Sequence, residues 1–561
     1  MNRLITIVKA ISFPITLSLF LFACDLCSSS GHSRKSDFFI PDFTPISIEL
    51  PNYDPDNPEM MLIKGNEDWD YINDLDKRFF FVTPGSYSLF VRFNESGTIE
   101  RPRYLIYYDP ANPNDETHPV HMSESKRATI KCFAFIGASY WIVDRLSVID
   151  SGDERNSISG RDRNNPTAER HPSGGFPVSR YTPSSYNIFN RLFIRGGSED
   201  SIIIYEGCNY NTIQNSVICE HRLPDKDWVG ILLQAYRGRR GYAEIIGTRI
   251  IANEIYNVND GIQVFDHPDI PMAPSYARTV IADNDLYITP ARYTDGYGNF
   301  TTSGGFAAAE NAIDIKAGSH DPDNPMYIVG NRMWGFRYID QSGIAGSNDH
   351  GTALAFHDGG QDRGYNGRYA YIMVKDNIIF DSAQGIVMEE LHHISVVNNV
   401  IWDIGAHGCT LDRHFLALDL EMNNCEFYRN TIIDSGNSTE KMEYWLWARG
   451  ERSSFDFREN VVINCDKNFF EVSPTKCLTD YNFYYNVGCM GSLGPWGDDD
   501  IVNDTASGSG NRDLVVLTKR ITDPQEKTIP YGSTSKSSLH KNNGDPHLGL
   551  VSDMGIDDNK Y

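Results

Sequence analysis

The chain has 561 residues, with 75 acidic and 50 basic side chains and a formal net charge of −25 at pH 7. A surface this acidic repels nucleic-acid phosphates at long range, so we expect no nucleic-acid partner. After the first residues no run of about 18 apolar residues occurs, so no later segment is expected to span a membrane.

The N-terminus has the features of an export signal. Lys9 precedes a mostly apolar stretch, residues 10–23, that is too short to span a bilayer and stop there. We therefore expect residues 1–23 to be a secretory signal peptide. The stretch ends in Leu-Phe-Ala-Cys24, which resembles a bacterial lipoprotein cleavage box. This resemblance implies an acylated Cys24 and an outer-membrane or cell-surface location. Ordinary cleavage near Ala23 would instead leave a periplasmic protein.

A short motif, an Asn followed by apolar strand residues, recurs at variable intervals along the chain. After most copies a turn leads into a second strand with alternating apolar residues, such as GIQVF, AIDIK and ALAFH. Many short strands without amphipathic helical windows predict an all-β solenoid. We expect the Asn side chains to fit tight turns and to bond the Asn of the next coil, a structural role. The motif occurs at Asn190, Asn215, Asn253, Asn284, Asn331, Asn377, Asn399, Asn430 and Asn460.

Two upstream segments suggest a fold family. FFFVTPGSYSLFVRF from Phe79 and CFAFIGASYWIVDRLSVID from Cys132 resemble the opening coils of right-handed parallel β-helix carbohydrate enzymes. The resemblance implies an all-β, right-handed parallel β-helix as the catalytic domain, over residues 78–490. Residues 37–77 are expected to cap its N-terminal end, because an open solenoid end exposes unpaired edges. Residues 491–561 are expected to form a C-terminal cap and tail, and residues 24–36 a flexible tether to the lipid anchor.

The ten Cys residues show no zinc-like spacing. Export permits disulfides, and buried thiols packed inside the solenoid are the alternative. The nearest candidate disulfide pairs are Cys208 with Cys219, Cys409 with Cys425, and Cys477 with Cys489.

The second strands predict which side chains face outward. Because alternate residues of a strand point to opposite faces, Ile262 and Val264, like their counterparts in later coils, should fill the interior. The outward residues of successive coils should then lie side by side, about 4.8 Å apart. One outward column reads Gln234, Phe265, Lys316, His357, Glu389 and Glu421; the other reads Leu232, Gln263, Asp314, Ala355, Val387 and Asp419.

Long insertions cluster beside this patch, at residues 289–310, 337–351 and 358–369. Loops raised over a flat sheet make a groove, and loops often carry function. A single polar residue on an outward column is more often ordinary solvated surface, so the grouping of several carries the hypothesis. The candidate substrate-binding residues are Gln263, His267, Arg337, Arg363 and Arg413.

The grouped residues suit removal of the C5 proton of a uronic acid, followed by β-elimination of the 4-linked sugar. This chemistry needs a base of suitable pKa and a positive partner for the uronate carboxylate. The catalytic candidates are Lys316, His357 and Glu389, and we expect burial or neighbouring cations to lower the pKa of Lys316. Asp314 and Asp358 are candidate ligands for a Ca²⁺ ion.

The layout resembles the β-helix polysaccharide lyases, the group of pectate, alginate and chondroitin or dermatan sulfate lyases. It implies an acidic polysaccharide as the partner, such as pectin, alginate or a glycosaminoglycan. We expect a monomer that touches the membrane only through its lipid anchor.

Two other functions stay open. A β-helix glycoside hydrolase would use two carboxyl groups, for which Glu389 with Asp314, Glu421 or Asp358 are candidates. A non-catalytic glycan-binding solenoid would use exposed aromatic residues, such as Trp445 and Trp447.

Overall fold

A computed structural model of the chain describes residues 43–503, with gaps. The expected signal peptide, Cys24, the tether and the tail beyond residue 503 lie outside the described residues. Within the described part, no helix is long and apolar enough to cross a membrane. The gaps are residues 153–154, 160–181, 198–199, 221–228, 236–243, 266–273, 290–309, 337–350, 358–368, 383, 390, 405–415, 420–423, 434–445, 449–454, 466–469, 473–476, 481–482 and 488–500.

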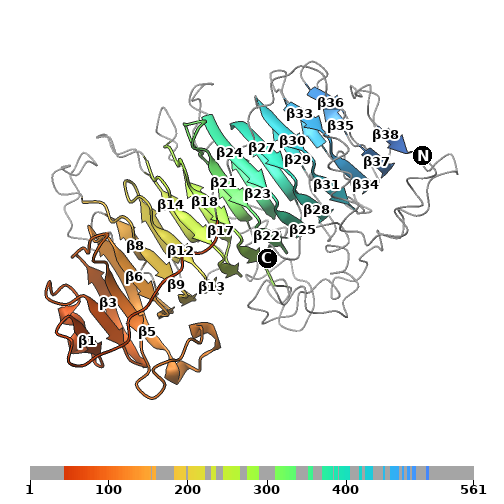
Figure 1. Ribbon diagram of the computed structural model, residues 1–561. Helices are drawn as coiled ribbons and strands as arrows, with labels where there is room; N and C mark the ends of the chain where they lie inside the picture. The colour runs from red at the N-terminus through yellow and green to blue at the C-terminus, as the bar shows by residue number, and fades with distance from the viewer. Residues whose placement is uncertain are drawn as a thin grey trace, which may run out of the picture. The chain divides into compact units, whose positions relative to one another are not determined.

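The strands form three faces, and within each face neighbouring strands pair in parallel (Figure 1). The first face consists of β1 (Met60–Ile63), β2 (Phe79–Val82), β4 (Arg103–Tyr107), β6 (Trp141–Asp144), β9 (Ile188–Asn190), β12 (Thr212–Gln214), β15 (Arg249–Ile251), β18 (Val280–Ala282), β21 (Met326–Val329), β24 (Tyr369–Lys375), β27 (His392–Val397), β30 (Cys425–Tyr428), β33 (Phe455–Arg458) and β36 (Cys477–Asp480). The second face consists of β7 (Ser147–Ile149), β10 (Phe193–Arg195), β13 (Val217–Cys219), β16 (Glu254–Tyr256), β19 (Asp285–Tyr287), β22 (Arg332–Trp334), β25 (Ile378–Ser382), β28 (Val400–Ile404), β31 (Thr431–Ile433), β34 (Val461–Cys465), β37 (Phe483–Val487) and β38 (Ile501–Asn503).

The third face consists of β8 (Asn156–Ser159), β11 (Ile202–Tyr205), β14 (Val229–Gln234), β17 (Asp260–Phe265), β20 (Asn311–Ile315), β23 (Thr352–His357), β26 (Gln384–Glu389), β29 (Leu416–Asp419), β32 (Leu446–Ala448) and β35 (Phe470–Val472). Near the N-terminal end, β3 (Gly85–Phe93) pairs with β5 (Ala128–Ile136), and β5 pairs with both β7 and β8, so it joins the second and third faces. Three short 3₁₀ helices lie among these first coils: η1 (Asn66–Tyr71), η2 (Pro119–His121) and η3 (Glu124–Lys126).

The chain visits the three faces in turn, and each coil pairs in parallel with the next. For example, β15, β16 and β17 are followed by their partners β18, β19 and β20. This topology confirms the predicted right-handed parallel β-helix. The stack already begins at β1, inside the segment expected to be the cap, because its apolar sequence pairs with β2. It also continues through β38, beyond the expected end at residue 490.

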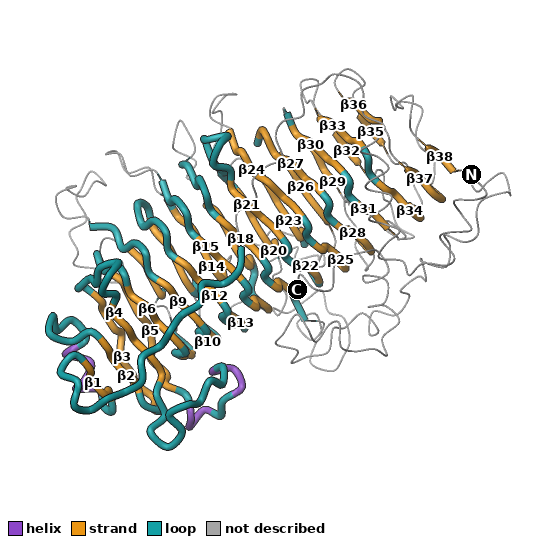
Figure 2. The backbone as a smooth tube through the Cα atoms, in the orientation of Figure 1, coloured by secondary structure: helices purple, strands orange, loops and turns teal. Residues whose placement is uncertain are grey.

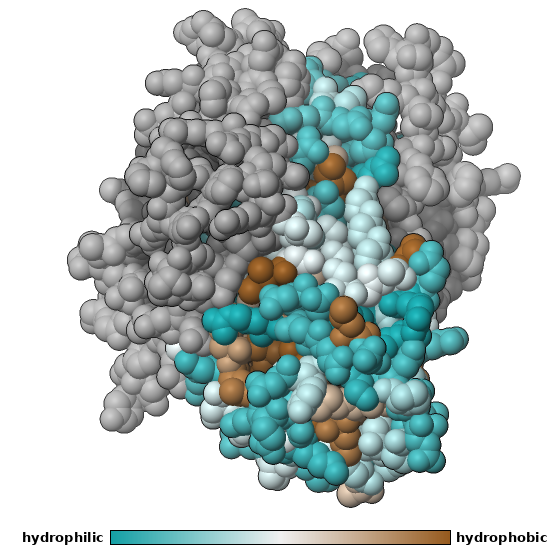
Figure 3. Space-filling view, turned by 90° about the vertical axis from the view of Figure 1, so that its left-hand side faces the viewer, coloured by the Kyte–Doolittle hydropathy of each residue, from teal (hydrophilic) through white to brown (hydrophobic). Residues whose placement is uncertain are grey.

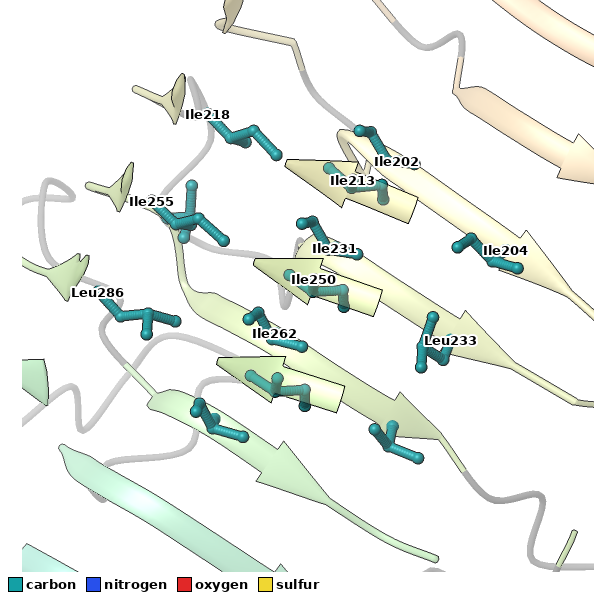
Figure 4. Packing of buried hydrophobic residues seen from close by; sticks show 14 of the residues in the cluster. Ile202, Ile204, Ile213, Ile218, Ile231, Leu233, Ile250, Ile255, Ile262 and Leu286 are labelled. Carbon is teal, nitrogen blue, oxygen red and sulfur yellow. The ribbon is translucent and has the colours of Figure 1, made fainter. Parts of the chain in front are cut away.

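In the coils that Figure 4 shows, the interior is filled by Ile and Leu side chains, each stacked on its equivalent in the next coil, whereas aromatic side chains such as Phe80, Phe135 and Trp141 fill the N-terminal coils. Ile231 and Leu233 of β14 lie over Ile262 and Val264 of β17, as the alternation in the sequence predicts. All four are fully buried. Because each coil alone cannot bury its inner side, the stack is stabilised only by neighbouring coils.

From β6 onward, the corner between the first and second faces is two residues long in every coil, whereas earlier in the chain β4 ends at Tyr107 and β5 begins only at Ala128. β15 ends at Ile251 and β16 begins at Glu254, and the same spacing separates β18 from β19 and β21 from β22. The first corner residue has a left-handed backbone, with φ of 56° at both Ala252 and Asp283. The second is the buried Asn. From Asn253 to Asn460 the motif Asn residues therefore follow the left-handed position instead of occupying it, contrary to the tight-turn role expected for them, whereas Asn215 (φ 52°) does occupy it.

The buried Asn side chains form a continuous ladder from Asn253 to Asn460. The side-chain oxygen of Asn331 accepts from the backbone N–H and the side-chain amide of Asn284, at 3.0 and 2.9 Å. The amide of Asn331 in turn donates to Asn377 and to the carbonyl of Ile281. The predicted bonding from coil to coil is thus confirmed. Asn190 and Asn215 lie outside the ladder, since Ser216 takes the equivalent position and caps it.

An extended N-terminal segment crosses the first face (Figure 2). The ring of Phe43 lies 5.6 Å from that of Tyr327 on β21, and Tyr53 packs on Phe81 of β2. Between them, the side chain of Gln214 bonds both the N–H and the carbonyl of Ile46, as a neighbouring strand would. The segment thus fastens several coils together. On the side that Figure 3 shows, hydrophobic residues form small separate groups in a mainly hydrophilic surface.

The structure tests two of the three candidate disulfides named from the sequence. Cys208, Cys219 and Cys425 are buried thiols. Two of the three candidate disulfides are therefore excluded, because Cys208 and Cys219 are not joined and Cys425 does not pair with Cys409. Cys208 and Cys425 belong to the interior cluster, the alternative that the sequence left open, whereas Cys219 packs with Phe193 and Val217 on the outer side of the second face.

Removing one rung of the Asn ladder should destabilise the solenoid. Asn331→Ala leaves the amide of Asn284, the carbonyl of Ile281 and the oxygen of Asn377 without this partner. Since each buried unsatisfied group costs about 1 to 3 kcal/mol, we expect a loss of about 3 kcal/mol or more in urea unfolding. The control is Asn398→Gly, which removes one exposed bond and keeps a left-handed residue (φ 56°), and should change stability by less than about 1 kcal/mol. Equal effects of the two variants would contradict a stabilising ladder.

Candidate functional site

The candidate site lies on the outer side of the third face, where β17, β20 and β23 pair in register. Gln263 lies beside Asp314, which lies beside Ala355 in the next coil. Lys316 directly follows β20, and its N–H donates to the carbonyl of Val264 at 2.8 Å, which extends the ladder by one residue. His357 ends β23. The predicted register thus agrees with the structure over these coils.

Asp314 is the centre of the site. Its side chain is fully buried, yet it contacts two groups that reach the surface. Nζ of Lys316 lies 3.2 Å from Oδ2, and Nε2 of His357 lies 2.8 Å from Oδ1. The side chain of Lys316 keeps 17% of its surface exposed and that of His357 keeps 32%. One buried carboxylate therefore holds an ammonium and an imidazole side by side at the protein surface.

The charges of this cluster stabilise one another. Burial would raise the pKa of Asp314, but His357, Lys316 and Gln263 together outweigh it and hold the pKa below its ordinary value of 3.8. Burial would lower the pKa of Lys316, but Asp314, Asp260 and Glu310 outweigh it and raise the pKa above 10.5. This is opposite to the lowered pKa expected from the sequence. Lys316 is therefore a permanent cation at neutral pH and not a base.

A second buried carboxyl lies behind the first. The side-chain nitrogen of Gln263 donates to Oδ2 of Asp260 and to Oδ2 of Asp314, both at 2.9 Å. Oδ1 of Asp260 accepts from the backbone N–H and the side-chain amide of Asn311, at 3.0 and 3.1 Å. Burial, with Glu310 and Asp314 nearby, raises the pKa of Asp260 well above 3.8. Asp260 was not recognised in the sequence; its position beside Gly261 at the start of a second strand was the only signal.

Gly261 explains how β17 and β20 approach so closely at this point. A Cβ there would lie 2.4 Å from the carbonyl oxygen of Ala312. Any side chain would therefore push apart the strands that carry Gln263 and Asp314.

An apolar surface adjoins the charged cluster on its N-terminal side. Phe265 precedes Lys316 in the outward column, and Nζ of Lys316 lies 5.6 Å from the centre of its ring. Phe265 packs against Ile203, Tyr205 and Leu232 of the preceding coils. The outer side of the third face therefore changes from apolar to charged between β17 and β20.

The structure reaches only part of the predicted site. It brings Gln263, Asp314, Lys316 and His357 together, but Gln263 is 7% exposed and engaged with two carboxyls, so it is not placed to bind substrate. The backbone of Glu389 pairs with that of His357, while its side chain lies outside the described residues. The other predicted site residues also lie outside them: His267, Arg337, Arg363, Arg413 and Asp358.

One coil of the predicted register was wrong. Glu389 pairs with Asp419, two residues before the predicted Glu421. The reason is that Leu416, Leu418 and Leu420 alternate, so a shift by two residues keeps the same faces inward.

Among the described residues, no three His, Cys, Asp or Glu side chains are grouped to hold a metal ion. The carboxylate of Asp314 is the one described candidate ligand, and it already contacts Lys316, His357 and Gln263. A Ca²⁺ ion on Asp314 would therefore have to displace the ammonium of Lys316.

Neither a protein-family model nor a curated protein sequence matches the chain. Solved structures match it in part. The A-module of a mannuronan C-5 epimerase from Azotobacter vinelandii aligns over 76% of this chain and 89% of that chain, with 10% identity and a TM-score of 0.39. An alginate lyase from Paenibacillus aligns over 68% and 96%, with 9% identity and a TM-score of 0.33. A surface adhesin of Streptococcus pneumoniae aligns over 72% and 82%, with 9% identity and a TM-score of 0.34.

Replacing the central carboxylate should produce a pH-dependent loss of stability. Asp314→Asn leaves Lys316 without its main counter-charge, and breaking a buried pair costs about 3 to 5 kcal/mol at neutral pH. Because the folded pKa of Asp314 lies below the unfolded value of 3.8, its contribution is present above that pH and is lost as the pH falls through the folded pKa. In urea unfolding, the difference in free energy of unfolding between wild type and Asp314→Asn should therefore become smaller as the pH is lowered.

The control is Asp56→Asn, at an exposed turn, which should leave the free energy of unfolding unchanged both at neutral pH and in acid. A gap for Asp314→Asn that stays constant with pH would contradict an ionised Asp314.

Proposed function

We propose that the third face binds an acidic polysaccharide and cleaves it by β-elimination beside a uronic acid, with Lys316 and His357 as the reacting groups. One observation carries this proposal. The buried carboxylate of Asp314 holds an ammonium and an imidazole on neighbouring coils, both partly exposed. Pairing distances of about 4.8 Å between coils let both side chains reach one glycosidic unit.

Lys316 supplies the positive charge that the reaction needs. The C5 proton of a uronate is poorly acidic because the neighbouring carboxylate is negative. An ammonium beside that carboxylate would stabilise the negative charge that develops when the proton leaves. The raised pKa of Lys316 keeps it charged at every physiological pH. It would also attract a polyanion locally, despite the net charge of −25 on the chain.

His357 is the candidate base. Its Nε2 faces Asp314, which fixes the orientation of the ring and would stabilise the imidazolium formed when His357 takes a proton. The ring nitrogen that does not face Asp314 would accept the C5 proton. An imidazole is suited to this task near neutral pH without a large change of its pKa.

The elimination balances as follows. The C5–H bond breaks and its proton passes to His357, the C4=C5 double bond forms, and the C4–O bond breaks. The departing sugar oxygen takes up a proton, for which the ammonium of Lys316 or the imidazolium is the nearest described donor. The product carries an unsaturated uronate at its new non-reducing end.

The alternative functions have less support in the described residues. The paired-carboxylate hydrolysis needs acids that touch the sugar, but Asp314 and Asp260 are fully buried. A purely binding solenoid needs no buried carboxylate holding an imidazole. As an enzyme for extracellular or cell-envelope polysaccharide, the protein would work outside the cytoplasm, in accord with the export signal and Cys24 anchor expected from the sequence.

Removing either reacting group should abolish most of the activity. The chain should be incubated with pectins, alginates and glycosaminoglycans while ultraviolet absorbance follows the unsaturated uronate. Lys316→Met and His357→Ala should each lower the rate by about 10² or more, since acid–base groups contribute about 10² to 10⁴. Lys316→Arg, which keeps the charge, should retain more activity than Lys316→Met. New reducing ends without absorbance would indicate a hydrolase, and neither signal in any substrate would sink the enzymatic proposal.

Chelation separates the two sources of positive charge. If Lys316 takes the place of a metal ion, activity in EDTA should match activity in added Ca²⁺, measured by the same absorbance. A loss in EDTA that Ca²⁺ restores would assign the carboxylate-neutralising role to the ion instead of the ammonium.

A further inference from the structure

Gln263 connects the two buried carboxyls that lie under the candidate site. Its side-chain nitrogen has two hydrogens, and the two carboxyl oxygens, one from Asp260 and one from Asp314, lie at the same 2.9 Å distance. Gln263 is itself buried. Its donor capacity is thus used inside the protein, and a sugar would have to break these bonds to reach it.

We propose that Gln263 is a positioning residue that joins Asp260 and Asp314 into a pair carrying a single negative charge, and that this charge stays on Asp314, where it faces His357 and Lys316. The catalytic consequence rests on the function proposed above, whereas the charge arrangement does not.

The groups around the pair decide which carboxyl is ionised. Asp314 on β20 faces the two basic groups, Lys316 and His357 of β23. Asp260 on β17 lies near Glu310 and Asp314, both acidic; Lys316 acts on it too but contacts Asp314, and the hydrogen-bond partners of Asp260 are the neutral amides of Gln263 and Asn311. Two carboxylates this close and this deeply buried repel each other, so one remains neutral. The neutral one is Asp260, because Lys316 and His357 both contact Asp314 directly.

This arrangement explains why an amide side chain is suited to residue 263. A carboxylate at residue 263 would add a third buried acid, and an apolar side chain would leave Asp314 without one of its donors. An amide nitrogen donates to both carboxyls without adding charge. Asp314 can then stay ionised and hold the imidazole of His357 in one orientation.

Two isosteric substitutions test the charge arrangement without any assay of activity. If Asp260 is neutral in the folded protein, the stability it contributes is present below pH 3.8 and is lost as the pH rises through its raised folded pKa. Asp260→Asn should therefore gain stability relative to wild type as the pH rises from about 4 to 7, in urea unfolding. Asp314→Asn should lose stability relative to wild type as the pH rises through the acid range. A change in hydrogen bonding alone would alter the free energy of unfolding by the same amount at about pH 4 and at about pH 7.

Infrared spectroscopy supplies the direct readout. At neutral pH the protonated-carboxyl band should be weaker in Asp260→Asn than in wild type, leaving the contribution of Glu254, whose pKa burial raises to about 7. Should Asp260→Asn instead lose stability with rising pH and leave the band unchanged, Asp260 is ionised and the proposal is wrong.

The role of Gln263 is tested by kinetics on whichever polysaccharide is cleaved. Gln263→Met should lower kcat by up to about 10²-fold with little change in KM, and should move the acidic limb of the pH–rate profile, because His357 loses its fixed partner. A raised KM with unchanged kcat and pH profile would identify Gln263 as a sugar ligand and overturn its positioning role. If no polysaccharide is cleaved, the proposed function fails, while the stability and infrared results still decide the charge arrangement.

Discussion

The asparagine ladder at the corner between the first and second faces is the interaction on which the rest of the structure depends. Each buried amide accepts from the coil before it and donates to the coil after it. Such bonds form in only one register, because a shift by one residue would bury an unpaired amide. The third face has its own register, because the connections that lead to it differ in length: Asp260 of β17 soon follows Tyr256, whereas Asn311 of β20 comes long after Tyr287. Asp314, Lys316 and His357 meet because β20 and β23 pair in register on coils that the ladder stacks.

The site itself is governed by the cost of burying charge. A carboxylate without water is tolerated only beside cations and donors, so the burial of Asp314 requires Lys316, His357 and Gln263 together. The same requirement determines the charge and orientation of two side chains at the surface. It keeps the ammonium charged and the imidazole oriented, although both side chains are exposed enough to touch a ligand. A structural need of the sheet and a chemical need of the proposed reaction are met by one residue.

The sequence predicts the fold well because its signals are local. Alternating apolar residues in GIQVF, AIDIK and ALAFH determine which side chains face inward, and through them the neighbourhood of Gln263, Asp314 and Lys316. The prediction fails where the local pattern is degenerate, as in the three alternating leucines before Glu421. It also fails where burial decides: the raised pKa of Lys316 and the part played by Asp260 depend on contacts across coils, which strand alternation does not reveal. Loop residues such as Arg337 and Arg363 cannot be assigned from strand register at all.

The constant two-residue corner has an evolutionary consequence. From β6 onward the chain varies in length only at the other two corners, so a segment cut from one such turn to the next is a complete coil with identical ends. Duplication or deletion of that segment would add or remove one rung and leave the flanking rungs able to bond each other. The third face would lengthen or shorten by about 4.8 Å each time, without disturbing the contacts of Asp314 with Lys316 and His357. The length of this face and the chemistry of the candidate site could therefore be selected independently in this architecture.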